Sequence, residues 1–138
     1  MPARNTTQAF LLVAMIIPIS ACGGEAPIVP ASGTVYRPDG LPLADASIIF
    51  RPVDGADAFR KKHKSIPISI LGDDGRFEMY LRADVEGVPS GRYKVYVMMD
   101  DENAEAKFPS QYFSFLQTPW EITLGPGGKS DIVLRMAN

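Results

Sequence analysis

Side chains that carry out covalent chemistry or bind metals are scarce in this chain. It has one cysteine, Cys22, and one histidine, His63. A single cysteine excludes an internal disulfide, and together with one histidine it is too few for a zinc site built from such ligands. The sequence lacks a Gly-x-Ser-x-Gly elbow, and one histidine leaves little basis for a nucleophile–base relay. We therefore predict a protein that is not an enzyme and that holds no metal or other cofactor.

The surroundings of Cys22 indicate a different chemistry. A single charge, Arg4, precedes the apolar run 10–17, which is typical of a signal peptide. The run is about half as long as the roughly 20 residues needed to span a bilayer. Residues 19–23, Ile-Ser-Ala-Cys-Gly, resemble the bacterial lipobox, which implies cleavage after residue 21 and lipidation of Cys22. The alternative is a buried core cysteine or a helical hairpin segment.

The segment after Cys22 is expected to be a tether. Residues 22–31 contain two glycines and two prolines without periodicity, so we predict a flexible spacer between the lipid and a domain over 32–138. The two or three acyl chains of a lipoprotein give lasting membrane attachment. Gly23, rather than Asp, follows Cys22, which by enteric sorting rules favours the outer membrane, facing the periplasm.

The composition favours a single all-β domain. The chain has 138 residues with 12 Gly and 12 Pro, which favours many turns over long helices. This length suits one domain. The formal net charge is −2, so there is no basic excess to neutralise a phosphate backbone, and we predict no nucleic-acid partner.

Apolar and polar residues alternate along several short segments, which indicates strands. We expect strands at 33–37, 44–52, 76–81, 93–99, 122–124 and 131–136, the first two as a hairpin-like pair. A further strand at 64–71 is expected at a sheet edge, because Pro67 has no amide donor. The residues predicted to face inward are Ala46, Ile48, Phe50, Phe77, Met79, Leu81, Tyr93, Val95, Val97, Met99, Ile122, Leu124, Ile132, Leu134 and Met136. About seven strands predict a single antiparallel β-sandwich, in which 54–63 and 100–118 have room only for helical turns.

Two charged clusters lie in these long connections. Residues 60–64, Arg-Lys-Lys-His-Lys, make Lys61, Lys62 and His63 candidate contacts for an acidic polymer, lipid headgroups or a carboxylate ligand. The alternative is a solvated loop or an edge strand protected by its lysines. The acidic run 100–105 is a candidate for a weak metal or basic-partner site, or is again a solvated loop.

Aromatic residues are concentrated in the second connection. Phe108, Tyr112, Phe113, Phe115 and Trp120 place five rings within thirteen residues. Such rings either form a platform that stacks on sugars or partner side chains, or close one end of the core. We expect Trp120 to be partly buried, because it begins a strand, and Tyr112 and Phe115 to be exposed contacts.

Several turn-plus-strand segments carry a family resemblance. Ser-Gly-Thr-Val-Tyr at 32–36, Asp-Gly-Leu-Pro-Leu-Ala-Asp-Ala at 39–46, Asp-Gly-Arg-Phe at 74–77 and Pro-Ser-Gly-Arg-Tyr-Lys-Val at 89–95 resemble the carboxypeptidase regulatory-like family. Residues 108–129 are similar to the version found in small lipoproteins of planctomycete-type bacteria. The resemblance covers 32–136 and implies a transthyretin-like sandwich. It implies no chemistry.

Together these features predict a non-catalytic, lipid-anchored lipoprotein of the cell envelope that acts as a binding or structural module. Its partner would be an envelope protein or a polysaccharide, besides the membrane itself. One alternative is a small periplasmic enzyme that uses loop carboxylates such as Asp73, Asp74 or Glu102, for which convergent carboxylates of perturbed pKa would be evidence. Another is a carbohydrate-binding module that uses the aromatic residues of 108–120.

Overall fold

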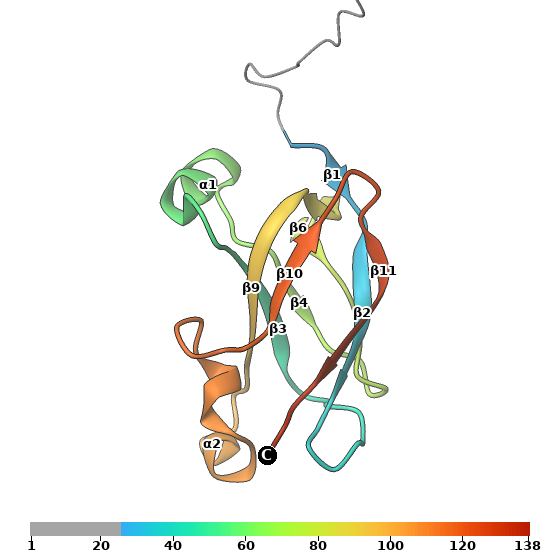
Figure 1. The fold of residues 1–138 in the computed structure, drawn as a ribbon, viewed down its shortest axis with the longest axis vertical. Coiled ribbons are helices and arrows are strands. Elements are labelled where there is room, and N and C mark those ends of the chain that lie inside the picture. The colour runs from blue at the N-terminus through green and yellow to red at the C-terminus, as the bar shows by residue number, and fades with distance from the viewer. Residues whose placement is uncertain (1–25) are drawn as a thin grey trace, which may run out of the picture.

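Two β-sheets pack face to face in the computed structural model, which describes residues 26–138 (Figure 1). The larger sheet has the order β10 (Glu121–Leu124), β9 (Gly91–Met98), β3 (Ser47–Pro52), β4 (Ile68–Ile70), β6 (Tyr80–Arg82), β7 (Val85–Glu86). The smaller sheet has the order β11 (Lys129–Arg135), β2 (Ala31–Tyr36), β5 (Arg76–Glu78). A separate pair joins β1 (Ile28–Val29) to β8 (Val88–Pro89). The predicted all-β sandwich is confirmed.

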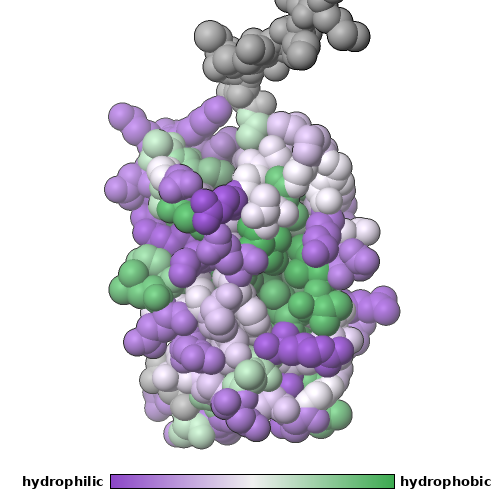
Figure 2. All heavy atoms as spheres, viewed as in Figure 1, coloured by the Kyte–Doolittle hydropathy of each residue, from purple (hydrophilic) through white to green (hydrophobic). Residues whose placement is uncertain are grey.

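The core lies between the two sheets. Phe50 of β3 packs against Phe77 of the smaller sheet and Tyr93 of β9, with ring centroids 6.1 Å and 5.7 Å apart. All residues predicted to face inward are buried except Met99, which is partly buried against the same core. In Figure 2, apolar residues gather along the line between β10 and β11, where the sheets meet without pairing. The period-two pattern therefore identified the core correctly.

The first two long strands do not form the expected hairpin. β2 belongs to the smaller sheet and β3 to the larger one. Between them, Leu43 and Ala46 are buried, and the Leu43 amide donates to the Val35 carbonyl at 2.9 Å. Burial of these apolar residues draws the connection across the end of the sandwich, so the chain changes sheets where a hairpin would have stayed in one.

The position expected for the 64–71 strand was also wrong. β4 lies between β3 and β6, not at an edge. Pro67 precedes the strand, is buried, and uses its carbonyl to accept the Phe50 amide at 3.0 Å. Its missing amide donor therefore interrupts no ladder within β4.

The sandwich begins before residue 32, inside the segment expected to be a tether. Val29 and Ala31 are 3% and 1% exposed. The Pro27 carbonyl accepts from the Ser90 amide, and the Pro30 carbonyl accepts from the Lys129 amide, both at 2.9 Å. These contacts make residues 27–31 part of the folded domain, so the expectation of a flexible spacer was wrong for these residues.

One strand pair departs from antiparallel pairing. β11 runs parallel to β2, with a register shift between Lys129 and Ile132. A Cβ on Gly33 would overlap the carbonyl oxygen of Ile132, so only glycine permits this approach.

The long connections contain short helices, as expected. α1 (Ala56–His63) fills the first, so residues 60–63 are helical and the edge-strand alternative for them was wrong. α2 (Ala104–Lys107) and the 3-10 helix η1 (Ser110–Phe113) fill the second. Within residues 26–138, no helix is both long and apolar enough to cross a membrane.

Candidate functional site

The aromatic segment 108–120 closes the core. Tyr112 and Trp120 are 1% and 9% exposed, and their rings lie 4.5 Å apart. The expected burial of Trp120 is confirmed, whereas the expected exposure of Tyr112 was wrong. Tyr112 is held inside because its hydroxyl accepts from the Ala137 amide at 2.7 Å. Phe108 and Phe113 also pack on the core.

Phe115 is half-buried and lies on the outer side of the larger sheet. The Arg51 guanidinium lies over its ring at 4.0 Å, and the Tyr96 ring is 6.3 Å away. The neighbouring Leu116 is 77% exposed. This geometry removes Tyr112 and Trp120 from any surface platform and leaves Phe115 as the candidate contact of the three.

The basic candidates lie on α1. Lys61 and Lys62 are exposed, and the His63 ring lies 4.5 Å from that of Phe59. Lys62 and His63 line a cavity of about 610 Å³ with Ala26, the first described residue. Cys22 lies outside the described residues, and its lipidation stays a prediction.

An apolar surface that the sequence analysis did not identify lies on part of the outer face of the larger sheet. Four large side chains are exposed there: Ile68 at 46%, Ile70 at 78%, Tyr80 at 36% and Met98 at 52%. The strand register places Ser47 between Ile70 and Met98 in one row, and Ile68 between Tyr80 and Ile49 in the next. Opposed residues of neighbouring strands share a face, so these side chains form one patch, which we call the apolar face.

The alternation at 66–70 was the available signal for this patch. It marks a strand, but it does not tell which of the two faces is covered. In the fold, Pro67 and Leu71 are buried, so Ile68 and Ile70 point outward.

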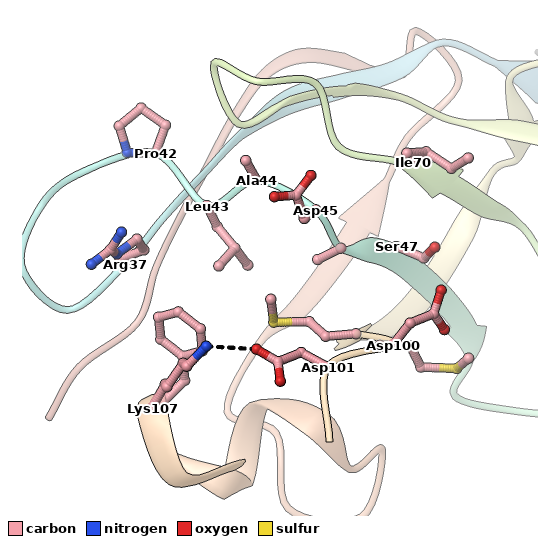
Figure 3. A pocket seen from close by; sticks show the side chains of 14 residues that line it. Arg37, Pro42, Leu43, Ala44, Asp45, Ser47, Ile70, Asp100, Asp101 and Lys107 are labelled. Carbon is pink, nitrogen blue, oxygen red and sulfur yellow. Dashed lines mark hydrogen bonds and ion pairs between the residues drawn. The ribbon is translucent and has the colours of Figure 1, made fainter. Parts of the chain in front are cut away.

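A cleft of about 950 Å³ adjoins the apolar face (Figure 3). Ser47 and Ile70 line both the cleft and a shallow groove of about 590 Å³ that runs along the apolar face. The crossing loop between β2 and β3 forms one wall, and the segment from Met98 to Phe108 forms the other. The two regions therefore offer one continuous surface, apolar on the sheet and polar in the cleft.

The charges of the cleft are unequally paired. Its two cations are engaged: Arg37 with Asp39, and Lys107 with Asp101, each at 2.7 Å. Hydrogen bonds from the Lys107 ammonium and the Asn103 amide lower the pKa of Asp101, so that carboxylate stays ionised.

Two carboxylates, by contrast, remain without an ion pair. Among the described residues, Asp45 and Asp100 have no basic partner. Asp45 is held in a left-handed backbone conformation, with φ of 58°, at the entrance to β3. The cleft is thus acidic, and it suits a cation.

The carboxylates proposed for catalysis do not share this cleft. Asp73 and Asp74 lie in the turn before β5, and Glu102 lies in the segment after β9. None of the three lines the cleft. Among residues 26–138, no group of three or more His, Cys, Asp or Glu side chains is arranged to hold a metal ion.

Comparison of the chain with protein-family models, curated proteins and solved structures finds no match.

Proposed function

We propose that this protein is a non-catalytic binding module of the cell envelope, anchored by lipid at Cys22 to the outer membrane and facing the periplasm, where it docks an envelope protein. The apolar face is the observation that carries the proposal. Four large exposed apolar side chains form one patch there, and such patches on soluble domains mark interaction sites. The sandwich agrees with the fold implied by the carboxypeptidase regulatory-like resemblance, and we propose membership of that family.

The chemistry of the surface defines the partner. Ile68, Ile70 and Met98 suit aliphatic or aromatic side chains of a protein segment. The unpaired carboxylates of Asp45 and Asp100 suit a lysine or arginine at the end of that segment. We therefore propose a partner that presents an apolar strip followed by a basic side chain, which enters the cleft.

A protein partner is better supported than a polysaccharide or a substrate. Sugar-binding platforms use exposed rings, and Tyr112 and Trp120 are buried. A general acid requires a raised pKa, whereas the pKa of Asp101 in the cleft is lowered; the carboxyl whose pKa is raised, Glu78 beside Glu86, does not line the cleft.

Site-specific photocrosslinking in intact cells tests the docking. A photoreactive residue at Ile70 should capture one envelope protein. The same residue at Val133, which is 56% exposed on β11 of the other sheet, should capture none. Ile70→Asp should abolish co-purification of that partner, while Val133→Asp leaves it unchanged, and neither should alter the melting temperature. Capture at both positions alike, a crosslinked homodimer, or a polysaccharide adduct would overturn the proposal.

The cleft is tested through its charge. Asp45→Asn with Asp100→Asn should weaken partner binding and reduce its dependence on salt, because two carboxylates are neutralised with little change in shape. Asp73→Asn with Asp131→Asn is the matched control and should have no effect, because both carboxylates are exposed, lie outside the cleft and make no ion pair among the described residues. Cys22→Ser tests the anchor: it should abolish palmitate labelling and release the protein from membranes. Soluble, unlipidated mature protein from native cells would refute anchoring.

A further inference from the structure

The basic helix α1 lies at the end of the sandwich where the described chain begins. The described chain begins at Ala26, and Ala26 lines one cavity together with Ala58, Phe59, Lys62 and His63 of α1. In Figure 1, α1 and β1 lie at the end of the sandwich where the described chain begins, while α2 and the C-terminus lie at the opposite end. The described chain therefore begins beside α1.

Charge is concentrated at this end. Residues 54–64 contain Arg60, Lys61, Lys62 and Lys64 against Asp54 and Asp57. Among the described residues, Arg60, Lys61 and Lys64 make no ion pair, and all three are exposed. Figure 2 shows hydrophilic residues projecting over α1. The opposite end presents Asp100, Asp101 and Glu102, so the charges are polarised along the axis that leads away from the tether.

We infer that α1 docks on the anionic lipid headgroups of the membrane in which Cys22 is anchored, and so fixes which end of the sandwich faces the bilayer. This inference rests on the lipid anchor of the proposed function. Only four peptide steps separate Cys22 from Ala26. Fully extended, they span at most about 14 Å, so the anchor holds α1 within reach of the headgroup layer.

Two physical effects favour this orientation. Electrostatic attraction to a charged surface decays over about 8 Å at physiological salt, a range that the short tether allows α1 to enter. Each Lys or Arg near an anionic surface strengthens binding about fivefold, while the acidic far end is repelled. With the basic end on the membrane, α2 and the acidic cleft beside it are directed away from the bilayer, toward a partner.

Fluorescence quenching on vesicles tests the orientation. Lipidated mature protein is reconstituted in phosphatidylcholine vesicles with or without phosphatidylglycerol, and with a headgroup-attached quencher. Ala58→Cys and Ala106→Cys place a label on exposed alanines of α1 and α2, at opposite ends. Because the Cys22 thiol is used by the lipid, the introduced thiol is the one available for labelling. In anionic vesicles the label at 58 should be strongly quenched and the label at 106 should not.

Charge removal distinguishes docking from proximity. Arg60→Gln with Lys61→Gln and Lys64→Gln should lower the ratio of docked to undocked protein by about a hundredfold. High salt or phosphatidylcholine alone should act in the same direction, with an unchanged melting temperature. Protein that floats with the vesicles but is quenched equally at both positions, or regardless of lipid charge, overturns the docking alone. Protein that fails to float, with Cys22 open to labelling, overturns the anchor and the docking together.

Discussion

The rings of Tyr112 and Trp120 lie 4.5 Å apart, and both side chains are hydrogen-bonded to the C-terminal segment. The Trp120 indole nitrogen donates to the Arg135 carbonyl at 3.3 Å, and the Tyr112 hydroxyl accepts from the Ala137 amide at 2.7 Å. This pair attaches the second long connection to the last strand and seals one end of the core.

Truncating this pair should therefore cost stability. Tyr112→Ala is expected to destabilise the domain by about 3–5 kcal/mol, because a large aromatic side chain leaves a cavity. Tyr112→Phe keeps the ring and loses one hydrogen bond, at a cost of about 1 kcal/mol. Urea denaturation measures both changes. Equal, small losses for the two variants would contradict a core role for the ring.

The domain boundary predicts a difference between two truncations. A chain beginning at Ala26 should unfold cooperatively with the stability of the mature protein. A chain beginning at Ser32 loses Val29, Ala31 and the two hydrogen bonds to the Pro27 and Pro30 carbonyls. Burying one valine alone contributes about 1.5–3 kcal/mol, so the shorter chain should be less stable by several kcal/mol. Thermal melts compare the stability of the two chains. Identical midpoints would mean that the domain begins at residue 32.

Gly33 is expected to be indispensable for the parallel pairing of β2 and β11. Gly33→Ala should destabilise by about 1–3 kcal/mol or more, because the new methyl group would push against the Ile132 backbone. Gly127→Ala is the matched control, since a Cβ there has no atom within 4 Å. Denaturation curves should separate the two variants. A neutral Gly33→Ala would mean that the strands can separate at little cost.

The Glu78–Glu86 pair makes the stability of the folded domain depend on pH. Hydrogen bonding and charge repulsion from Glu86 raise the pKa of Glu78 above its ordinary value of 4.5. A carboxyl group with a raised pKa in the folded state favours folding at low pH, and that contribution is lost as pH rises through its folded pKa.

Glu86→Gln removes the repulsion. It should therefore raise the melting temperature slightly at pH 7, with a smaller difference near pH 3, where the Glu78 carboxyl is protonated and is no longer repelled. Glu121→Gln should act in the opposite direction at pH 7, because Glu121 pairs with Arg92 at 2.6 Å. Melting curves across this pH range provide the measurement. A lower melting temperature for Glu86→Gln at pH 7 would show that the pair is not repulsive.

The sandwich could be predicted because period-two alternation of apolar and polar residues marks strands that have one buried face. Phe77, Val95 and Ile132 all face the core, as their spacing indicates, because successive side chains of a strand point to opposite faces. Most connections are short and rich in Gly and Pro, so helices occur only in the two long ones, as α1, α2 and η1 among the described residues.

The sequence by itself thus determined the class of fold, the identity of most core residues and the basic character of residues 60–64. Tertiary structure alone decided which strands pair. β2 and β3 lie in different sheets because the burial of Leu43 carries the chain across the sandwich. Tertiary structure also decided that Ile68 and Ile70 are exposed, since alternation defines two faces without telling which one another layer covers. The burial of Tyr112 was decided there too, because η1 packs its ring against Trp120. The apolar face and the acidic cleft arise from residues far apart in the chain. Their proximity depends on long-range pairing, which local patterns do not encode.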